Sequence, residues 1–152
     1  MSLSQLQQAM ANIRIGLAEI QNKEQQLDSM ISQFRTQLRR LPRQIIYGNL
    51  PLDSSISSMG EIEERLMDTI STKERLLKIK KAATDELAAL ESVKQVDEAK
   101  KSLASLKEQY AGSDNDAETL SEIHQLQQFI ADHSKRAELA IRERYLERQL
   151  ET

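Results

Sequence analysis

Two histidines, one serine and a few acidic pairs are the residues whose types and spacing could support catalysis or metal binding. His124 and His133 are nine residues apart, which on an ideal helix is about 900°, so they face opposite sides and cannot share a metal ion. Ser121 precedes His124 by three residues, but the sequence offers no third group to orient that histidine. Acid pairs such as Asp85–Glu86 fall on a predicted solvated helix rather than in a pocket. We therefore expect no enzymatic activity, no catalytic residues, no cofactor and no metal site.

The chain also lacks cysteine, which excludes disulfides, cysteine nucleophiles and thiolate metal sites. Its four glycines stand alone, so we predict no glycine-rich phosphate loop. The first residues have neither a basic flank nor an apolar stretch, and no apolar run is long enough to cross a bilayer. We expect a cytoplasmic protein, with the nucleus as the alternative location.

The net charge of −3 is divided unevenly along the chain. Residues 2–44 carry six basic and three acidic side chains, whereas residues 113–152 carry five basic and nine acidic ones. A cluster of five basic side chains in residues 73–81 surrounds a predicted helix instead of forming a stripe. This distribution suits packing of a basic helix on an acidic one, or a head-to-tail contact between molecules. It argues against specific nucleic-acid binding and limits membrane contact to a peripheral one.

These side chains are carried by a chain whose composition is that of a helical protein. Charged residues make up 30% of the 152 residues and aromatic residues only 3%. Leu, Ile, Ala, Glu, Lys, Gln and Arg favour helices, and the shortage of aromatic bulk predicts a thin aliphatic seam rather than a wide core. We predict an all-α fold, an elongated helical bundle or coiled coil of three long helices.

Residues 1–41 carry the clearest periodicity, which predicts a first coiled-coil helix. A heptad that starts at Leu3 places apolar residues at eleven of its twelve a and d positions, which are Leu3, Leu6, Met10, Ile13, Leu17, Ile20, Glu24, Leu27, Ile31, Phe34, Leu38 and Leu41. So narrow and regular a stripe is typical of a coiled-coil seam. The one polar position, Glu24, is either a tolerated surface glutamate or a polar layer that sets the register.

Residues 42–57 are predicted to form a hinge that contains both prolines. Pro42 disfavours helical geometry at the preceding residue, which predicts that the first helix ends at Leu41. Four large apolar side chains lie within this hinge, namely Ile45, Ile46, Tyr47 and Leu50. Two interpretations stay open: these side chains cap one end of the bundle, or they bind a partner.

Residues 58–152 are predicted to form a hairpin of two helices, 58–111 and 114–150. Ser58 and Glu61 have the spacing of a capping box, and Gly112 can take the left-handed conformation that ends a helix. The apolar face of the first of these helices is interrupted by Lys73 and Lys80. Because so few residues join the two helices, we expect them to run antiparallel.

These expectations favour a non-enzymatic coiled-coil scaffold or adaptor subunit that mediates protein–protein interaction within a larger assembly and self-associates. The candidate partner-binding residues are those of the first seam and of the hinge: Leu6, Ile13, Leu17, Ile20, Leu27, Ile31, Phe34, Ile45, Ile46, Tyr47 and Leu50. The alternative is a peripheral membrane-associated, BAR-like helical module. The net charge of −3 and the absence of a basic stripe count against that alternative.

Overall fold

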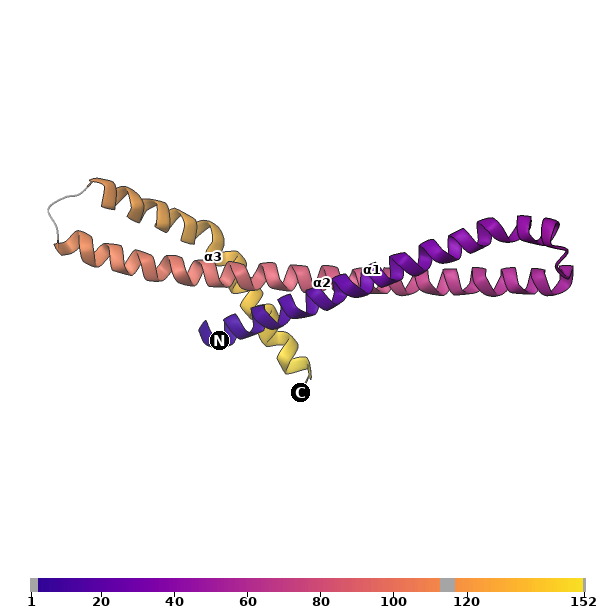
Figure 1. Cartoon of the computed structure of the whole chain (residues 1–152). Helices are drawn as coiled ribbons and strands as arrows, with labels where there is room; N and C mark the ends of the chain where they lie inside the picture. The colour runs from indigo at the N-terminus through magenta and orange to yellow at the C-terminus, as the bar shows by residue number, and fades with distance from the viewer. Residues whose placement is uncertain (1–2, 113–116, 152) are drawn as a thin grey trace. The chain divides into compact units, whose positions relative to one another are not determined.

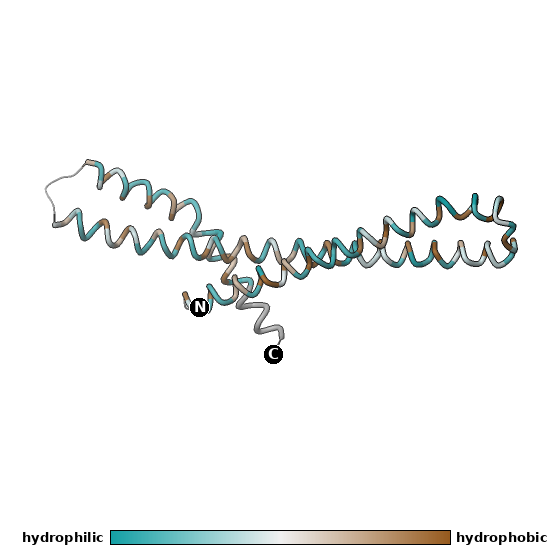
Figure 2. Tube along the Cα trace, in the orientation of Figure 1, coloured by the Kyte–Doolittle hydropathy of each residue, from teal (hydrophilic) through white to brown (hydrophobic). Residues whose placement is uncertain are grey.

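The computed structural model describes residues 3–112 and 117–151, with the side chains of the last helix through Glu143. The described residues form three α-helices and no strand: α1 (Leu3–Gly48), α2 (Leu52–Gly112) and α3 (Ala117–Glu151) (Figure 1). Apolar residues recur among polar ones along all three helices (Figure 2). The prediction of an all-α fold with three long helices is confirmed for this part of the chain. None of these helices combines the length and the apolar character needed to cross a membrane.

The chain divides into two compact units. One comprises residues 15–83, which are most of α1, the turn and the first half of α2. We call it the α1–α2 unit. The other comprises residues 1–14 and 84–152, so it contains the start of α1, the second half of α2 and α3. This division replaces the predicted boundaries at residues 41 and 57, because α1 and α2 each contribute to both units.

The end of α1 lies seven residues beyond the predicted one. The helix continues through Leu41 and Pro42 to Gly48. Proline inside a helix removes one backbone hydrogen bond and is costly, but here the apolar spacing continues, since Leu41 and Ile45 are both half-buried. Packing therefore overrides the local preference of the residue before proline, and the predicted helix end was wrong.

The link between α1 and α2 is only three residues long, so the prediction of a hinge over residues 42–57 was wrong. Asn49 adopts a left-handed backbone with φ of 54° and closes α1, a role that asparagine can take at a helix C-terminus. The carbonyl oxygen of Pro51 accepts the first bond of α2 from the amide of Ser55 at 3.1 Å. It also accepts the Ser55 hydroxyl at 2.6 Å. Helix α2 therefore starts at Leu52, and the predicted cap at Ser58 lies inside it.

The second predicted turn is described only in part. Gly112 belongs to α2 and its φ is not positive, so the expected left-handed conformation is not found there. The expected capping residues, 113–116, lie outside the described residues. The antiparallel arrangement of α2 and α3 stays a prediction.

A seam of aliphatic and small side chains joins the two helices of the α1–α2 unit. Leu27 and Ile31 of α1 are buried, with 3% and 7% of their surface exposed. From α2, Thr69 is buried and its hydroxyl donates to the carbonyl oxygen of Arg65 at 2.7 Å. An internal hydrogen bond of this kind lets a polar side chain sit in an apolar seam without an unpaired donor.

Two ion pairs cross the same seam and show how the helices are matched. Glu24 pairs with Lys80 at 2.9 Å, and Asp28 pairs with Lys73. Because the residue numbers rise on α1 while they fall on α2, the helices run in opposite directions within this unit. The side chain of Glu24 is half-buried, with 21% of its surface exposed. This environment favours the polar-layer interpretation of Glu24. The two lysines that interrupt the apolar face of α2 are the cross-helix partners of Glu24 and Asp28, respectively Lys80 and Lys73.

The other unit has its own small core. Leu6 and Met10 of α1 pack with Leu90 of α2, surrounded by partly buried Ala9, Ile13, Leu87 and Val93. An ion pair between Arg14 and Glu91 at 3.4 Å lies at the exposed edge of this contact. From α3, the buried apolar side chains are Ile123, Ala137 and Ala140.

The position of Pro42 generates a first prediction. Replacing Pro42 with alanine should raise the free energy of unfolding by about 1–3 kcal/mol, because it restores a helical hydrogen bond and removes a ring clash. Thermal and denaturant unfolding of the full chain measure this change. Pro51→Ala is the matched control and should not stabilise, since Pro51 precedes α2 and only its carbonyl is used. A destabilised Pro42→Ala variant would contradict the continuous α1 helix.

Candidate interaction surface of the α1–α2 unit

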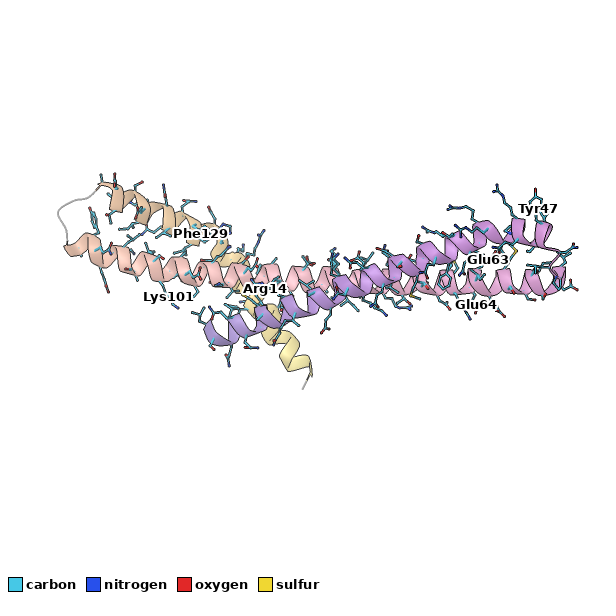
Figure 3. All side chains as sticks on the ribbon, viewed as in Figure 1. Arg14, Tyr47, Glu63, Glu64, Lys101 and Phe129 are labelled. Carbon is cyan, nitrogen blue, oxygen red and sulfur yellow. The ribbon has the colours of Figure 1, made fainter. Side chains whose placement is uncertain are left out.

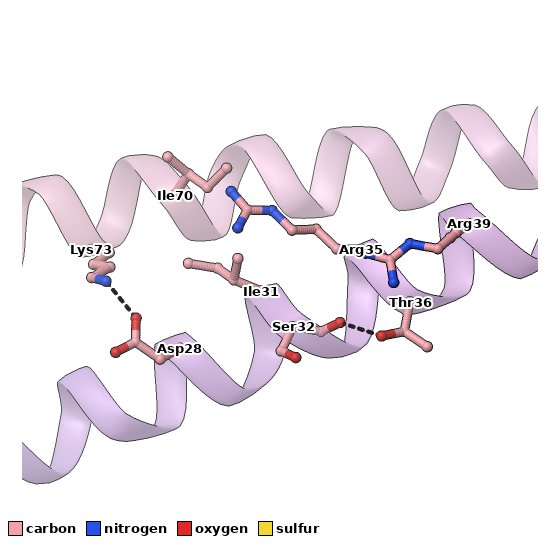
Figure 4. A pocket seen from close by; sticks show the side chains of 8 residues that line it. All are labelled: Asp28, Ile31, Ser32, Arg35, Thr36, Arg39, Ile70 and Lys73. Atoms are coloured by element: carbon pink, nitrogen blue, oxygen red, sulfur yellow. Dashed lines mark hydrogen bonds and ion pairs between the residues drawn. The ribbon is translucent and has the colours of Figure 1, made fainter.

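The α1–α2 unit has two flanks, one on each side of the seam, and a groove marks each of them. On the first flank, an open groove of about 510 Å³ is lined from α1 by Asp28, Ile31, Ser32, Arg35, Thr36 and Arg39, and from α2 by Ile70 and Lys73 (Figure 4). On the second flank, a groove is lined by Thr36, Gln37, Arg40, Leu41 and Gln44 of α1 with Ile62 of α2. The two grooves show which side chains of each helix share a flank.

The first flank continues toward the turn as an exposed apolar surface. On α2, Ile56 and Glu63 precede Ile70 at intervals of seven residues, so all three lie on one line along the helix. Met67, four residues after Glu63, and Leu52, four before Ile56, lie beside that line. The exposed fractions are 63% for Leu52, 58% for Ile56 and 63% for Met67. These four-residue and seven-residue intervals place three large, mostly exposed apolar side chains on one face of α2.

Helix α1 extends the same surface. Ile46 follows Arg39 by seven residues and therefore lies on the flank that Arg39 lines. Its exposed fraction is 73%. We define the apolar flank as Arg35, Arg39 and Ile46 of α1 with Leu52, Ile56, Glu63, Met67 and Ile70 of α2.

The second flank is chemically different, and we call it the polar flank. Gln37 and Gln44 line its groove together with Arg40. Ser58 and Arg65, one turn either side of Ile62, bring further polar side chains to this side of α2. On α2 near the turn, the exposed Leu52, Ile56 and Met67 lie together on the first flank. Other exposed apolar side chains of the unit, such as Ile15, Met30 and Ile79, lie outside this group, and single exposed apolar residues of that kind need no explanation.

Charged side chains are interspersed on the apolar flank. Within the described part of the chain, no acidic side chain approaches Arg35 or Arg39 to form an ion pair, and no basic one approaches Glu63. Compensation of the helix dipole is one explanation for Arg35, Arg39 and Arg40, because they lie toward the end of α1. That explanation fails, because α1 runs eight residues past Arg40 and has no basic residue in its last turn.

The structure separates the sequence-predicted partner-binding residues into two groups. The seven from the first seam are covered within the chain: Leu6, Leu27 and Ile31 are buried, and Ile13, Leu17, Ile20 and Phe34 are half-buried. The four from the predicted hinge lie near the turn, where Ile45 is half-buried and Ile46, Tyr47 and Leu50 are exposed. Tyr47 projects from the end of α1 (Figure 3) and has 88% of its surface exposed. Of the two interpretations of the hinge, capping by the bundle does not hold for these exposed three.

Sequence reasoning missed the α2 half of this surface, namely Leu52, Ile56, Glu63 and Met67. A weak signal was present, because Ile56, Ile70 and Leu77 repeat at intervals of seven or fourteen residues. However, α2 carries this line directly beside the stripe that packs on α1, which includes Ile62 and Leu66. Only the contacts with α1 show which of the two adjacent stripes is left exposed.

The unit that contains α3 has a groove of its own and also carries the two histidines. The groove lies between Leu3 and Leu6 of α1, Val93 and Val96 of α2, and the α3 residues Ala137 and Ile141, with charged residues at its rim. The ring of His133 contacts that of Phe129 at a centroid distance of 4.4 Å, whereas His124 is exposed. Among the described residues, no three His, Asp or Glu side chains converge as metal ligands would.

Comparison of the chain with protein-family models, with curated proteins and with solved structures finds no match.

The exposure of the apolar flank predicts a contrast in stability between two sites. Ile56→Gln should change the free energy of unfolding by no more than about 0.5 kcal/mol, because the side chain is mostly exposed. Leu27→Ala should lower it by about 2–5 kcal/mol, because Leu27 is buried in the seam. Urea unfolding of the two variants measures both values, at a protein concentration low enough that the chains do not associate. A loss at Ile56 as large as that at Leu27 would mean that the flank is covered within one chain.

Proposed function

We propose that this protein is a non-enzymatic scaffold or adaptor subunit that binds a protein partner through the apolar flank. The observation that carries this proposal is the alignment of Ile46, Ile56 and Met67, each 58–73% exposed, on one flank of a helix pair. The seam of that pair is already filled by its own side chains. The exposed residues are therefore surplus to internal packing and available to a partner.

Burial of the exposed apolar side chains is sufficient for association only when charged residues of the flank also form favourable contacts. Full burial of a large aliphatic side chain contributes roughly 1.5–3 kcal/mol, so three of them contribute about 5–9 kcal/mol. Association costs an estimated 4–15 kcal/mol in lost translational and rotational freedom. The apolar contact alone is thus near balance, and the interspersed Arg35, Arg39 and Glu63 would decide which partner binds.

The proposal includes a finer architecture for the rest of the chain. We propose that α2 and α3 form an antiparallel hairpin around residues 113–116 and that the helices pack as coiled coils. A groove shared by Val93 and Val96 of α2 with Ala137 and Ile141 of α3 supports the pairing. A cytoplasmic location, with the nucleus as the alternative, belongs to the same proposal and rests on the absence of cysteine.

A peripheral membrane module is the second candidate. It is favoured by the exposed Ile46, Tyr47 and Leu52 close to Arg43 at the turn, since apolar and basic residues together bind acidic bilayers. Against it stands Glu63, which lies on the apolar flank in line with Ile56 and Ile70. A carboxylate on that surface is repelled by an anionic bilayer, so we favour the protein partner.

The proposal predicts that partner binding depends on one flank and not on the other. Cross-linking and mass spectrometry of the native assembly identify the chain attached to α2 near Ile56, and calorimetry then measures its affinity. Ile56→Asp should weaken that affinity at least tenfold, because it forces a carboxylate into an apolar contact. Gln37→Asp, which adds the same charge to the polar flank, should have little effect. If the two variants bind equally well, or if Gln37→Asp is the weaker, the apolar flank is not the binding surface.

A further inference from the structure

We infer that the partner of the apolar flank is a second copy of this chain, placed with its turn at the same level and related by a two-fold axis parallel to α1 and α2. This inference rests on the proposed function, because it names the occupant of the same flank. Its basis is the level at which charged and apolar residues lie on that flank, because a two-fold rotation brings Arg39 to Glu63 and Ile46 to Ile56.

The register of α1 on α2 determines which residues are level with one another. The residue numbers of the ion pairs Asp28–Lys73 and Glu24–Lys80 add up to 101 and 104. Continued toward the turn, this antiparallel register places Arg39 level with about residue 63, and Ile46 level with about residue 56. At these two levels, α1 carries a cation where α2 carries a carboxylate, and an apolar residue where α2 carries another. Arg35 is level with about residue 67 and has no acidic residue opposite it.

A two-fold rotation about an axis parallel to the helices lays α1 of one copy on α2 of the other without changing these levels. Arg39 of each copy then meets Glu63 of its neighbour, and Ile46 meets Ile56. Both contacts occur twice, so a single two-fold interface pairs each Arg39 with a Glu63 and covers each Ile46 with an Ile56. The product is a four-helix arrangement in which neighbouring helices alternate in direction, as in many natural bundles.

The same features disfavour other occupants. An anionic bilayer would attract Arg39 but repel Glu63, which lies at the same level of the same flank. A basic partner such as a nucleic-acid-binding surface would be repelled by Arg35 and Arg39. A surface that carries Arg39 and Glu63 at one level can pair both of them with a copy of itself.

Charge reversal on the full chain tests the inference, with dissociation constants taken from analytical ultracentrifugation. Arg39→Glu and Glu63→Arg should each weaken dimerisation about tenfold, because each symmetric dimer gains two like-charge contacts. Arg40→Glu and Glu64→Arg are the matched controls. They make the same charge changes one residue further along each helix. Arg40 lies on the polar flank, and Glu64 lies on a different face of α2 from Glu63 (Figure 3). Both controls should leave the dissociation constant of the dimer at its wild-type value.

Mixing the two variants gives the decisive result. In an equimolar mixture of Arg39→Glu and Glu63→Arg chains, the mixed dimer has two complementary contacts, so its dissociation constant should return to within about threefold of wild type. Contacts within each chain stay mismatched, so recovery can come only from contacts between chains. A mixed dimer no tighter than the two homodimers would overturn the inference.

The remaining outcomes separate the inference from the proposed function. If the wild-type chain keeps the mass of a single copy up to about millimolar concentration, a second copy does not occupy the apolar flank. This result overturns the inference regardless of how the charge-reversal variants behave. If Ile56→Asp then still weakens binding to another identified protein, the proposed function stands while the inference fails. If instead the single chain binds phosphatidylserine vesicles and Ile56→Asp abolishes that binding, the flank meets a membrane and both are wrong.

Discussion

The ion pairs Glu24–Lys80 and Asp28–Lys73, together with the buried Leu27 and Ile31, fix the rotation and register of α1 against α2. Everything said about the surface of the α1–α2 unit depends on this one contact. A helix pair whose seam contains only aliphatic side chains can shift by a turn at little cost, whereas a half-buried carboxylate and its lysine tolerate one register. Once the rotation is fixed, the residues beside the seam are assigned to one flank or the other.

That assignment explains why a protein of this composition has an exposed apolar flank. The chain lacks the aromatic bulk for a wide core, so each helix can bury only a narrow stripe, and any second apolar stripe is left exposed. On α2 the second stripe carries Ile56 and Met67, and the short turn at Asn49 brings Ile46 of α1 beside it. A thin core and a tight turn thus produce a linear surface that suits another helix pair better than a small molecule.

The sequence was most informative where one physical rule acted alone. The heptad of α1 predicted its buried face from Leu6 to Leu41, because regular spacing and burial are directly linked. Prediction from the sequence failed where local and tertiary preferences competed. Pro42 predicted a helix end that the packing of Leu41 and Ile45 overrides. Ser58 predicted the start of the second helix, but α2 begins earlier, after Pro51. The exposed stripe of α2 was not predictable, because two adjacent stripes have similar composition and only contact with α1 selects the inner one.

The oxidation rates of three methionines measure most directly whether a partner covers the apolar flank in the native assembly. Met67 lies on the apolar flank with 63% of its surface exposed, Met30 lies seven residues before Gln37 on the polar flank with 41% exposed, and Met10 is 2% exposed. Oxidation by peroxide followed by mass spectrometry gives a rate for each. In the native assembly we expect Met67 to oxidise several-fold more slowly than Met30, with Met10 slowest of all. Oxidation of Met67 at the rate of Met30 or faster would contradict the apolar flank as the interaction surface.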